Sequence, residues 1–194
     1  MNSTITHTTE IVPVIDTERL CLRAFRREDA ADVYAYTRNP RVLRYTTGKT
    51  PRTLAESQAF VDRHIGASPG FFAWAIRRKD DPRVIGAVEF SISEDTAGTI
   101  DYALGEEHWN QGLMTEAATA VLDWAFRTYP LLEQVTSAAL TINPASIRVM
   151  EKCGLVFQQY DREKWEKFEG EVTLAVYSIS RAAWNLRHDS EGGQ

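Results

Sequence analysis

One stretch of the chain, "HWNQGLMTEA" at residues 108–117, combines a glycine with the start of a run that has helical spacing. Because Gly112 has no Cβ atom, backbone N–H groups beside it can approach a ligand closely. A helix that starts there adds unpaired N–H donors and the positive end of its dipole, which together favour a phosphate group. The glycine alone fits a plain strand-to-helix turn equally well. The chain has neither GxGxxG nor GxxxxGK, so a Rossmann or P-loop nucleotide site is not indicated.

A second stretch, "NPASIRVMEKCG" at residues 143–154, carries three helix signals in register. Asn143 suits the N-cap, Pro144 the first helical position, and Gly154 the position just past the end. The hydroxyl group of Ser146 falls in the first turn. By itself this pattern needs no ligand, since capping the helix accounts for it.

The elements that would hold these two stretches follow from periodicity and turn composition. Strands are predicted at 19–25, 71–78, 84–93, 98–104, 134–142 and 172–180, and helices at 28–37, 53–65, 114–128 and 143–154. This order predicts an α/β fold with a mixed sheet and a βαβ unit at its centre. One domain is expected over 15–186, with flexible tails at 1–14 and 187–194.

The composition excludes several classes of protein. At 43% hydrophobic and 25% charged residues the chain is of ordinary globular type, and no apolar run is long enough to span a membrane. The N-terminus lacks a secretory leader, and two cysteines suit a reducing compartment, so a cytoplasmic protein is expected. The net charge of -5 argues against a nucleic-acid partner and mildly favours an amine-bearing substrate. The four histidines, His7, His64, His108 and His188, lack metal-ligand spacing, so no metal site is predicted.

Taken together, the two stretches resemble the signatures of the GNAT acyltransferases, which use acetyl-CoA. "YALGEEHWNQGLMTEA" is similar to the family's strand 4, pyrophosphate loop and central helix, and "NPASIRVMEKCGL" to its second signature. The segments "TERLCLRAFRREDAADVYAYTRNPRVLRY" and "VYSISRAAW" resemble the RimJ/RimL-like branch, so the likeness covers residues 16–184. It implies a mostly antiparallel twisted sheet that is splayed at strands 4 and 5, with helices on both faces.

The resemblance also implies where acetyl-CoA binds. The expected contacts are the strand 4 backbone, the loop and helix start, and the second signature: Tyr102, Ala103, Leu104, Trp109, Asn110, Gln111, Gly112, Leu113, Met114, Thr115, Asn143 and Ser146. Asn110 replaces a common glycine and makes the loop less flexible than usual. Met150 occupies the place where some branches have a catalytic tyrosine, so Ser146 is the candidate to stabilise the departing sulfur.

The base that deprotonates the amine is less defined. Many relatives have a glutamate where this chain has Thr99, and Asp101 lies two residues on, on the same sheet face. Glu89 on the neighbouring strand shares its face with Ala87 and Ser91. Either carboxylate could deprotonate the amine, and for each the alternative is an ordinary charged residue at the surface. The remaining alternatives are Glu163, Glu166 and Glu169.

Two functions follow from the resemblance. The first is an N-acetyltransferase acting on a primary amine of a small molecule, a peptide or a protein N-terminus, with a homodimer as a compatible assembly. The second is a catalytically weak acyl-CoA-binding sensor or interaction module, which the missing tyrosine and glutamate keep open. An α-amine is expected to be preferred over a lysine side chain.

Overall fold

A single sheet of eight strands runs through the computed structural model, which describes residues 11–65, 69–93 and 96–191. The strands are β1 (Ile15–Asp16), β2 (Leu20–Ala24), β3 (Phe71–Arg78), β4 (Val84–Ser93), β5 (Ala97–Leu104), β6 (Gln134–Leu140), β7 (Val156–Lys164) and β8 (Glu171–Ser180). They lie in the order β1-β2-β3-β4-β5-β6-β8-β7, and every neighbouring pair is antiparallel except β5 and β6. The predicted mixed sheet and its central βαβ unit are confirmed, and the predicted strands at 71–78, 84–93 and 98–104 form an antiparallel meander.

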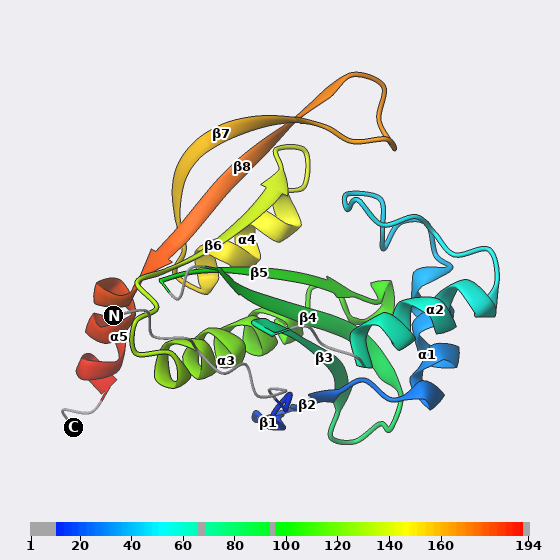
Figure 1. Ribbon diagram of the computed structural model, residues 1–194, viewed down its shortest axis with the longest axis horizontal. Coiled ribbons are helices and arrows are strands. Elements are labelled where there is room, and N and C mark those ends of the chain that lie inside the picture. The colour runs from blue at the N-terminus through cyan, green and yellow to red at the C-terminus, as the bar shows by residue number, and fades with distance from the viewer. Residues whose placement is uncertain (1–10, 66–68, 94–95, 192–194) are drawn as a thin grey trace, which may run out of the picture.

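Helices cover both faces of this sheet, as expected (Figure 1). They are α1 (Ala30–Thr37), α2 (Leu54–Ile65), α3 (Leu113–Thr128), α4 (Pro144–Lys152) and α5 (Arg181–Glu191). One apolar cluster joins the sheet to α3 through residues at helical spacing, such as Ala117, Val121 and Ala125. A second cluster, with Val33 and Val61, joins the opposite face to α1 and α2. No helix among the described residues is long and apolar enough to cross a membrane.

The sheet opens at its only parallel pair of strands. β5 and β6 are joined at three positions, from Ala97 with Gln134 to Thr99 with Thr136. β5 then continues beside β4 to Leu104, whereas β6 follows β8 to Leu140. Figure 1 shows β6 leaving the plane of β5. The expected splay between the family's strands 4 and 5 therefore lies here.

Sequence reasoning missed two strands, β1 and β7. β1 spans only two residues, too few for a periodic pattern. β7 has no apolar period, because nearly all its side chains are exposed at the edge of the sheet. Helix α5 extends to Glu191, so the expected tail at 187–194 is helical over its first five residues. At the other end, residues 1–10 lie outside the described residues, but Pro13 accepts a 2.8 Å hydrogen bond from the Trp74 indole.

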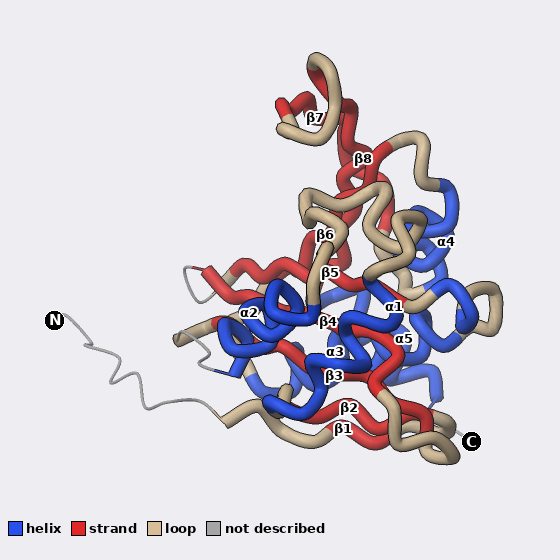
Figure 2. The backbone as a smooth tube through the Cα atoms, turned by 90° about the vertical axis from the view of Figure 1, so that its right-hand side faces the viewer, coloured by secondary structure: helices blue, strands red, loops and turns tan. Residues whose placement is uncertain are grey.

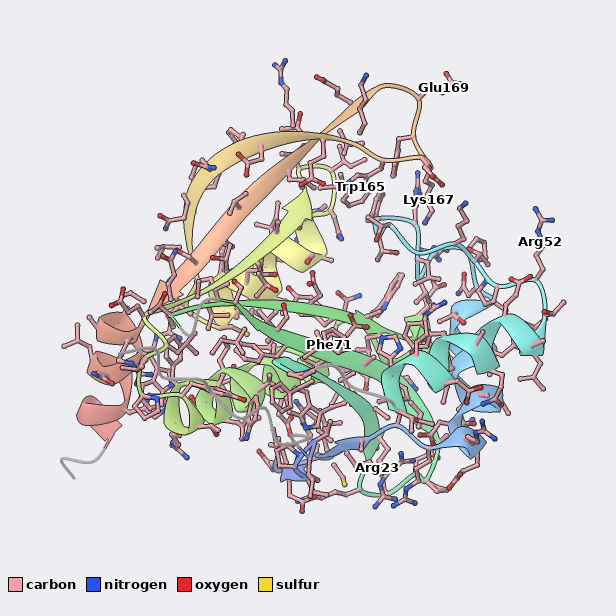
Figure 3. All side chains as sticks on the ribbon, in the orientation of Figure 1. Arg23, Arg52, Phe71, Trp165, Lys167 and Glu169 are labelled. Carbon is pink, nitrogen blue, oxygen red and sulfur yellow. The ribbon has the colours of Figure 1, made fainter. Side chains whose placement is uncertain are left out.

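The β7–β8 hairpin projects from the rest of the molecule, as Figure 2 shows. Its tip nevertheless contacts a segment far away in sequence. The ammonium group of Lys167 donates to the backbone carbonyls of Leu43 at 2.7 Å, Thr46 at 3.0 Å and Gly48. Partial burial lowers the pKa of Lys167. The tip is thus fixed above the 43–48 segment, and Figure 3 shows Lys167 between the two.

Candidate active site

The loop between β5 and α3 is held in an unusual backbone conformation. Gly112 has φ 76° at the N-cap of α3, and Asn110 has φ 58°, the only positive φ of a non-glycine residue among those described. Asparagine tolerates this region better than most residues, so it can hold the loop in this conformation. The first hydrogen bond of the helix runs from the Glu116 N–H to the Gly112 carbonyl at 3.0 Å. The N–H groups before Glu116 therefore have no partner inside the helix.

The side chains of the other predicted loop residues brace the loop or pack into the core. The indole N–H of Trp109 donates to the carbonyl of Leu104 at 2.7 Å, which occupies that carbonyl and braces the loop. Leu113 and Met114 point into the core, at 1% and 7% exposure, so only their backbone can contact a ligand. The side chain of Gln111 donates to the Glu107 carbonyl at 2.9 Å.

An arginine that the sequence did not single out fixes this loop. Arg19 donates from its backbone N–H and its Nε to the Glu116 carboxylate, at 2.8 and 2.7 Å, and from its guanidinium to the Gln111 carbonyl at 2.9 Å. Thr17 also donates to Glu116, at 2.5 Å. Burial opposes ionisation of Glu116, but these hydrogen bonds prevail and lower its pKa. The arrangement places the Arg19 guanidinium, paired with Glu116, beside Gly112 at the start of α3.

A cleft of about 910 Å³ begins at the splay and extends toward α1 and α2. Ala87 and Glu89 of β4, and Asp101 and Ala103 of β5, contribute to one wall. Other walls come from β6, from the start of α4 and from α1 and α2, and Trp165 of the hairpin tip also lines the space. Glu163 instead accepts from the Trp165 indole at 2.8 Å, and Glu166 pairs with Lys49 at 3.1 Å. Glu163, Glu166 and Glu169 are not among the residues that line this cleft.

At the splay, Tyr102 and Ser146 bring two hydroxyl groups together. The Tyr102 hydroxyl lies 3.2 Å from Ser146 Oγ and donates to the Ser146 carbonyl at 3.2 Å. Asn143 caps α4 by accepting from the Ser146 N–H at 3.3 Å, as its predicted N-cap role requires. Burial raises the pKa of Tyr102, so its phenol stays protonated and can donate.

The sequence interpretation missed this side chain. It expected no tyrosine acid because position 150 is methionine, and Met150 is indeed in the core at 1% exposure. It assigned only backbone contacts to Tyr102. The phenol reaches Ser146 from β5 across the gap in the sheet, which no local pattern could indicate.

The two predicted carboxylates face each other across β4 and β5. Glu89 is the direct register partner of Asp101, and Ser91 and Thr99, whose hydroxyls are 2.6 Å apart, form the next pair on that face. Asp101 is accessible from the cleft, but the surrounding protein displaces much of the bulk water. This desolvation, followed by the charge of Glu89, raises the pKa of Asp101. Like charges directly opposite on a sheet are unfavourable, so the pair is typical of a functional site.

His64 lies beside these two carboxylates, although the spacing of the histidines in the sequence predicted no role for it. Its Nδ1 lies 2.7 Å from the Phe60 carbonyl, and since a carbonyl only accepts, Nδ1 carries a hydrogen. Its Nε2 lies 3.0 Å from Glu89 Oε1, within hydrogen-bond distance. The imidazole is stacked on Phe60 at 3.9 Å between ring centroids. His64 therefore fixes the Glu89 carboxylate in the cleft.

Comparison with known proteins identifies the family. The family model described as "Acetyltransferase (GNAT) domain" matches residues 19–156. This chain belongs to the GNAT acetyltransferase family. It is 26% identical over 175 residues to the protein named "Uncharacterized N-acetyltransferase YoaA" of Bacillus subtilis (strain 168), covering 86% of this chain and 96% of that protein.

Solved structures agree with this assignment at the level of the fold. A GNAT-family acetyltransferase from Bacillus anthracis superposes with a TM-score of 0.78 at 24% identity, over 87% of this chain and 98% of that one. The spermidine N-acetyltransferase of Vibrio cholerae, crystallised with CoA and spermine, superposes with a TM-score of 0.73 at 19% identity, over 87% and 99%. The protein is an acetyl-CoA-dependent acetyltransferase. Within the described ranges, no group of three or more residues is arranged to hold a metal ion, and His7 lies outside them.

The residues present fit acetyl-CoA. The N–H groups of Gly112 to Thr115, with the guanidinium of Arg19 beside them, would hold the pyrophosphate. The edge of β5 that β6 leaves, including Tyr102 and Ala103, would hold the pantetheine arm. When bound, acetyl-CoA supplies an acetyl group activated as a thioester.

Replacing Gly112 by proline is expected to weaken acetyl-CoA binding at least about tenfold, or ~1.4 kcal/mol. Proline cannot adopt the observed φ of 76° and removes one N–H from the helix start. Calorimetry on the folded variant measures the change. Gly170→Pro is the matched control, because Gly170 has φ 86° with open space around it at the hairpin tip. Equal affinities of Gly112→Pro and wild type would contradict the loop assignment.

Proposed function

We propose that this GNAT enzyme acetylates α-amines of peptides or amino acids, and that it belongs to the RimJ/RimL-like branch. The observation that carries the proposal is the division of chemistry across one cleft. Proton acceptors, Asp101 and Glu89, lie on the sheet face, and hydroxyl donors, Tyr102 and Ser146, lie at the splay. Transfer of an acetyl group to an amine needs both, because a proton leaves the nitrogen and a proton reaches the sulfur.

Asp101 is the proposed general base. Its raised pKa makes it a stronger proton acceptor than an ordinary aspartate, and it is accessible from the cleft. As the bond from nitrogen to the acetyl carbon forms, Asp101 takes the amine proton directly or through water. Glu89 supports this role by its negative charge, and His64 keeps Glu89 in place.

The hydroxyl pair acts on the leaving group. Tyr102 and Ser146 form one hydrogen-bonded unit. As the carbon–sulfur bond breaks, Ser146 can donate to the sulfur, and Tyr102 can do so by turning its hydrogen away from the Ser146 carbonyl. Both groups have high intrinsic pKa values, so stabilising the developing thiolate is their main contribution. Ser146 is held in position by the helix start that Asn143 caps.

The preference for an α-amine follows from proton affinity. An α-amine with a pKa of about 8 is substantially neutral near pH 7, whereas a lysine amine with a pKa of about 10 is almost wholly protonated. A larger fraction of an α-amine is already neutral, so less deprotonation by Asp101 is needed before the amine can react. The sensor alternative is not favoured, because relatives are N-acetyltransferases by name and the cleft holds both proton acceptors and donors. Two buried free cysteines support the cytoplasm as the proposed compartment.

Thiol release from acetyl-CoA with a set of amines tests this function. We expect turnover of a peptide with a free α-amine at a kcat/KM at least about tenfold above that of an N-terminally blocked lysine peptide, since tenfold is ~1.4 kcal/mol of barrier. Spermine, the ligand crystallised with the Vibrio cholerae relative, serves as the comparison polyamine. A preference for the blocked lysine peptide or for spermine would contradict the substrate assignment, and binding of acetyl-CoA without turnover of any amine would restore the sensor.

Tyr102→Phe and Ser146→Ala are each expected to lower kcat at least about tenfold, while the Kd for acetyl-CoA changes little. The reason is that the hydroxyl pair stabilises charge that develops on the sulfur only during the reaction. Single-turnover kinetics and calorimetry measure the two quantities. Tyr160→Phe, on the exposed edge strand, is the control for loss of a phenol. If kcat is unchanged in both variants while chemistry limits the rate, the pair only caps α4.

The pH profile of kcat/KM reports the base. Because the pKa of Asp101 is raised, the aspartate accepts a proton only above that pKa, and activity should fall as pH drops through it. Asp101→Asn should remove this acidic limb and leave mainly the titration of the amine. Glu89→Gln should move the limb to lower pH, because the neighbouring negative charge is lost. The control is Glu163→Gln. If Asp101→Asn and Glu89→Gln both keep the wild-type pH profile of kcat/KM, neither carboxylate is the general base.

A further inference from the structure

One residue that lines the cleft carries a buried hydroxyl group with no partner among the described residues. Ser57 of α2 is 2% exposed, and its Oγ has no hydrogen bond among the described residues. Buried polar side chains are nearly always hydrogen-bonded, so an orphan of this kind needs an explanation. The only comparable atom among the described residues is Nε of Arg77, which does not line the cleft. The orphan hydroxyl therefore marks a place where the cleft can receive a polar group.

The position of Ser57 relates this place to the reacting end of the cleft. Ser57, Phe60 and His64 are spaced three and seven residues apart, so they share one face of α2, and all three line the cleft. His64 contacts Glu89, the register partner of Asp101. At 1.5 Å per residue, Ser57 lies roughly 10 Å along the helix from His64. The wall between them is the ring of Phe60, which is apolar.

An extended peptide advances about 3.3 Å per residue, so roughly 10 Å corresponds to about three residues. We infer that Ser57 binds the backbone of the third residue of an acceptor peptide whose α-amine reacts beside Asp101. A serine hydroxyl both donates and accepts, so it can bind either the carbonyl or the N–H of a peptide group. The second residue then passes the apolar surface of Phe60. This inference rests on the proposed function and makes Ser57 a specificity-determining residue for acceptor length.

The test compares alanine peptide amides of increasing length, from dialanine amide to tetra-alanine amide, as acceptors with acetyl-CoA. For the wild-type enzyme we expect kcat/KM to rise at least about fivefold from the dipeptide to the tetrapeptide, the change appearing mainly in KM. In Ser57→Ala the ratio of the two kcat/KM values should fall toward one. The variant should fold, because alanine removes an unpaired buried hydroxyl, and its melting temperature should equal or exceed that of the wild type.

Ser178→Ala is the matched control, since Ser178 is also buried, at 5% exposure, but does not line the cleft. It should keep the wild-type length ratio. A length ratio in Ser57→Ala equal to that of the wild type, or no length dependence in the wild type, would overturn the role of Ser57 while leaving the proposed function intact. Absence of turnover with every peptide in the wild type would overturn the proposed function, and the inference with it.

Discussion

The short parallel ladder between β5 and β6 is the constraint on which the site depends. Three paired positions join the strands, while β5 is held to β4 over eight positions and β6 to β8 over seven. The two longer antiparallel ladders hold the strands on diverging paths, so the sheet must open between them. The opening exposes one edge of β5 and creates the cleft where cofactor and acceptor can meet.

This opening also separates the proposed proton acceptors from the hydroxyl pair in space. Residues of β5 alternate between faces, so Asp101 faces Glu89 on one side, whereas Tyr102 reaches Ser146 on α4 across the gap. In the proposed mechanism, two neighbouring positions of one strand thereby serve opposite ends of a proton transfer. If β6 stayed paired with β5 to its end, α4 would start elsewhere and the two hydroxyl groups could not meet.

Long-range contacts then fix the loop and the hairpin tip around the opening. Arg19 and Glu116 hold the loop that precedes α3, and Lys167 holds the hairpin tip against the segment near Leu43. Glu116 accepts hydrogen bonds from several donors, and Lys167 donates to several backbone carbonyls. Several charge-assisted hydrogen bonds restrain a loop more firmly than a single ion pair at the surface. A cleft with fixed walls can select an acceptor by the position of its polar groups.

The sequence by itself determined the local features. Asn143, Pro144 and Gly154 set the ends of α4, Gly112 set the start of α3, and the period of two placed Glu89 and Asp101 on their faces, because each depends on neighbours within a few residues. Only the tertiary structure decided which side chains meet. The contacts of Tyr102 with Ser146 and of His64 with Glu89 span 44 and 25 residues, and β7 is paired through its backbone with exposed side chains. Such contacts depend on how strands diverge and helices pack, and no spacing along the chain encodes a distance across a cleft.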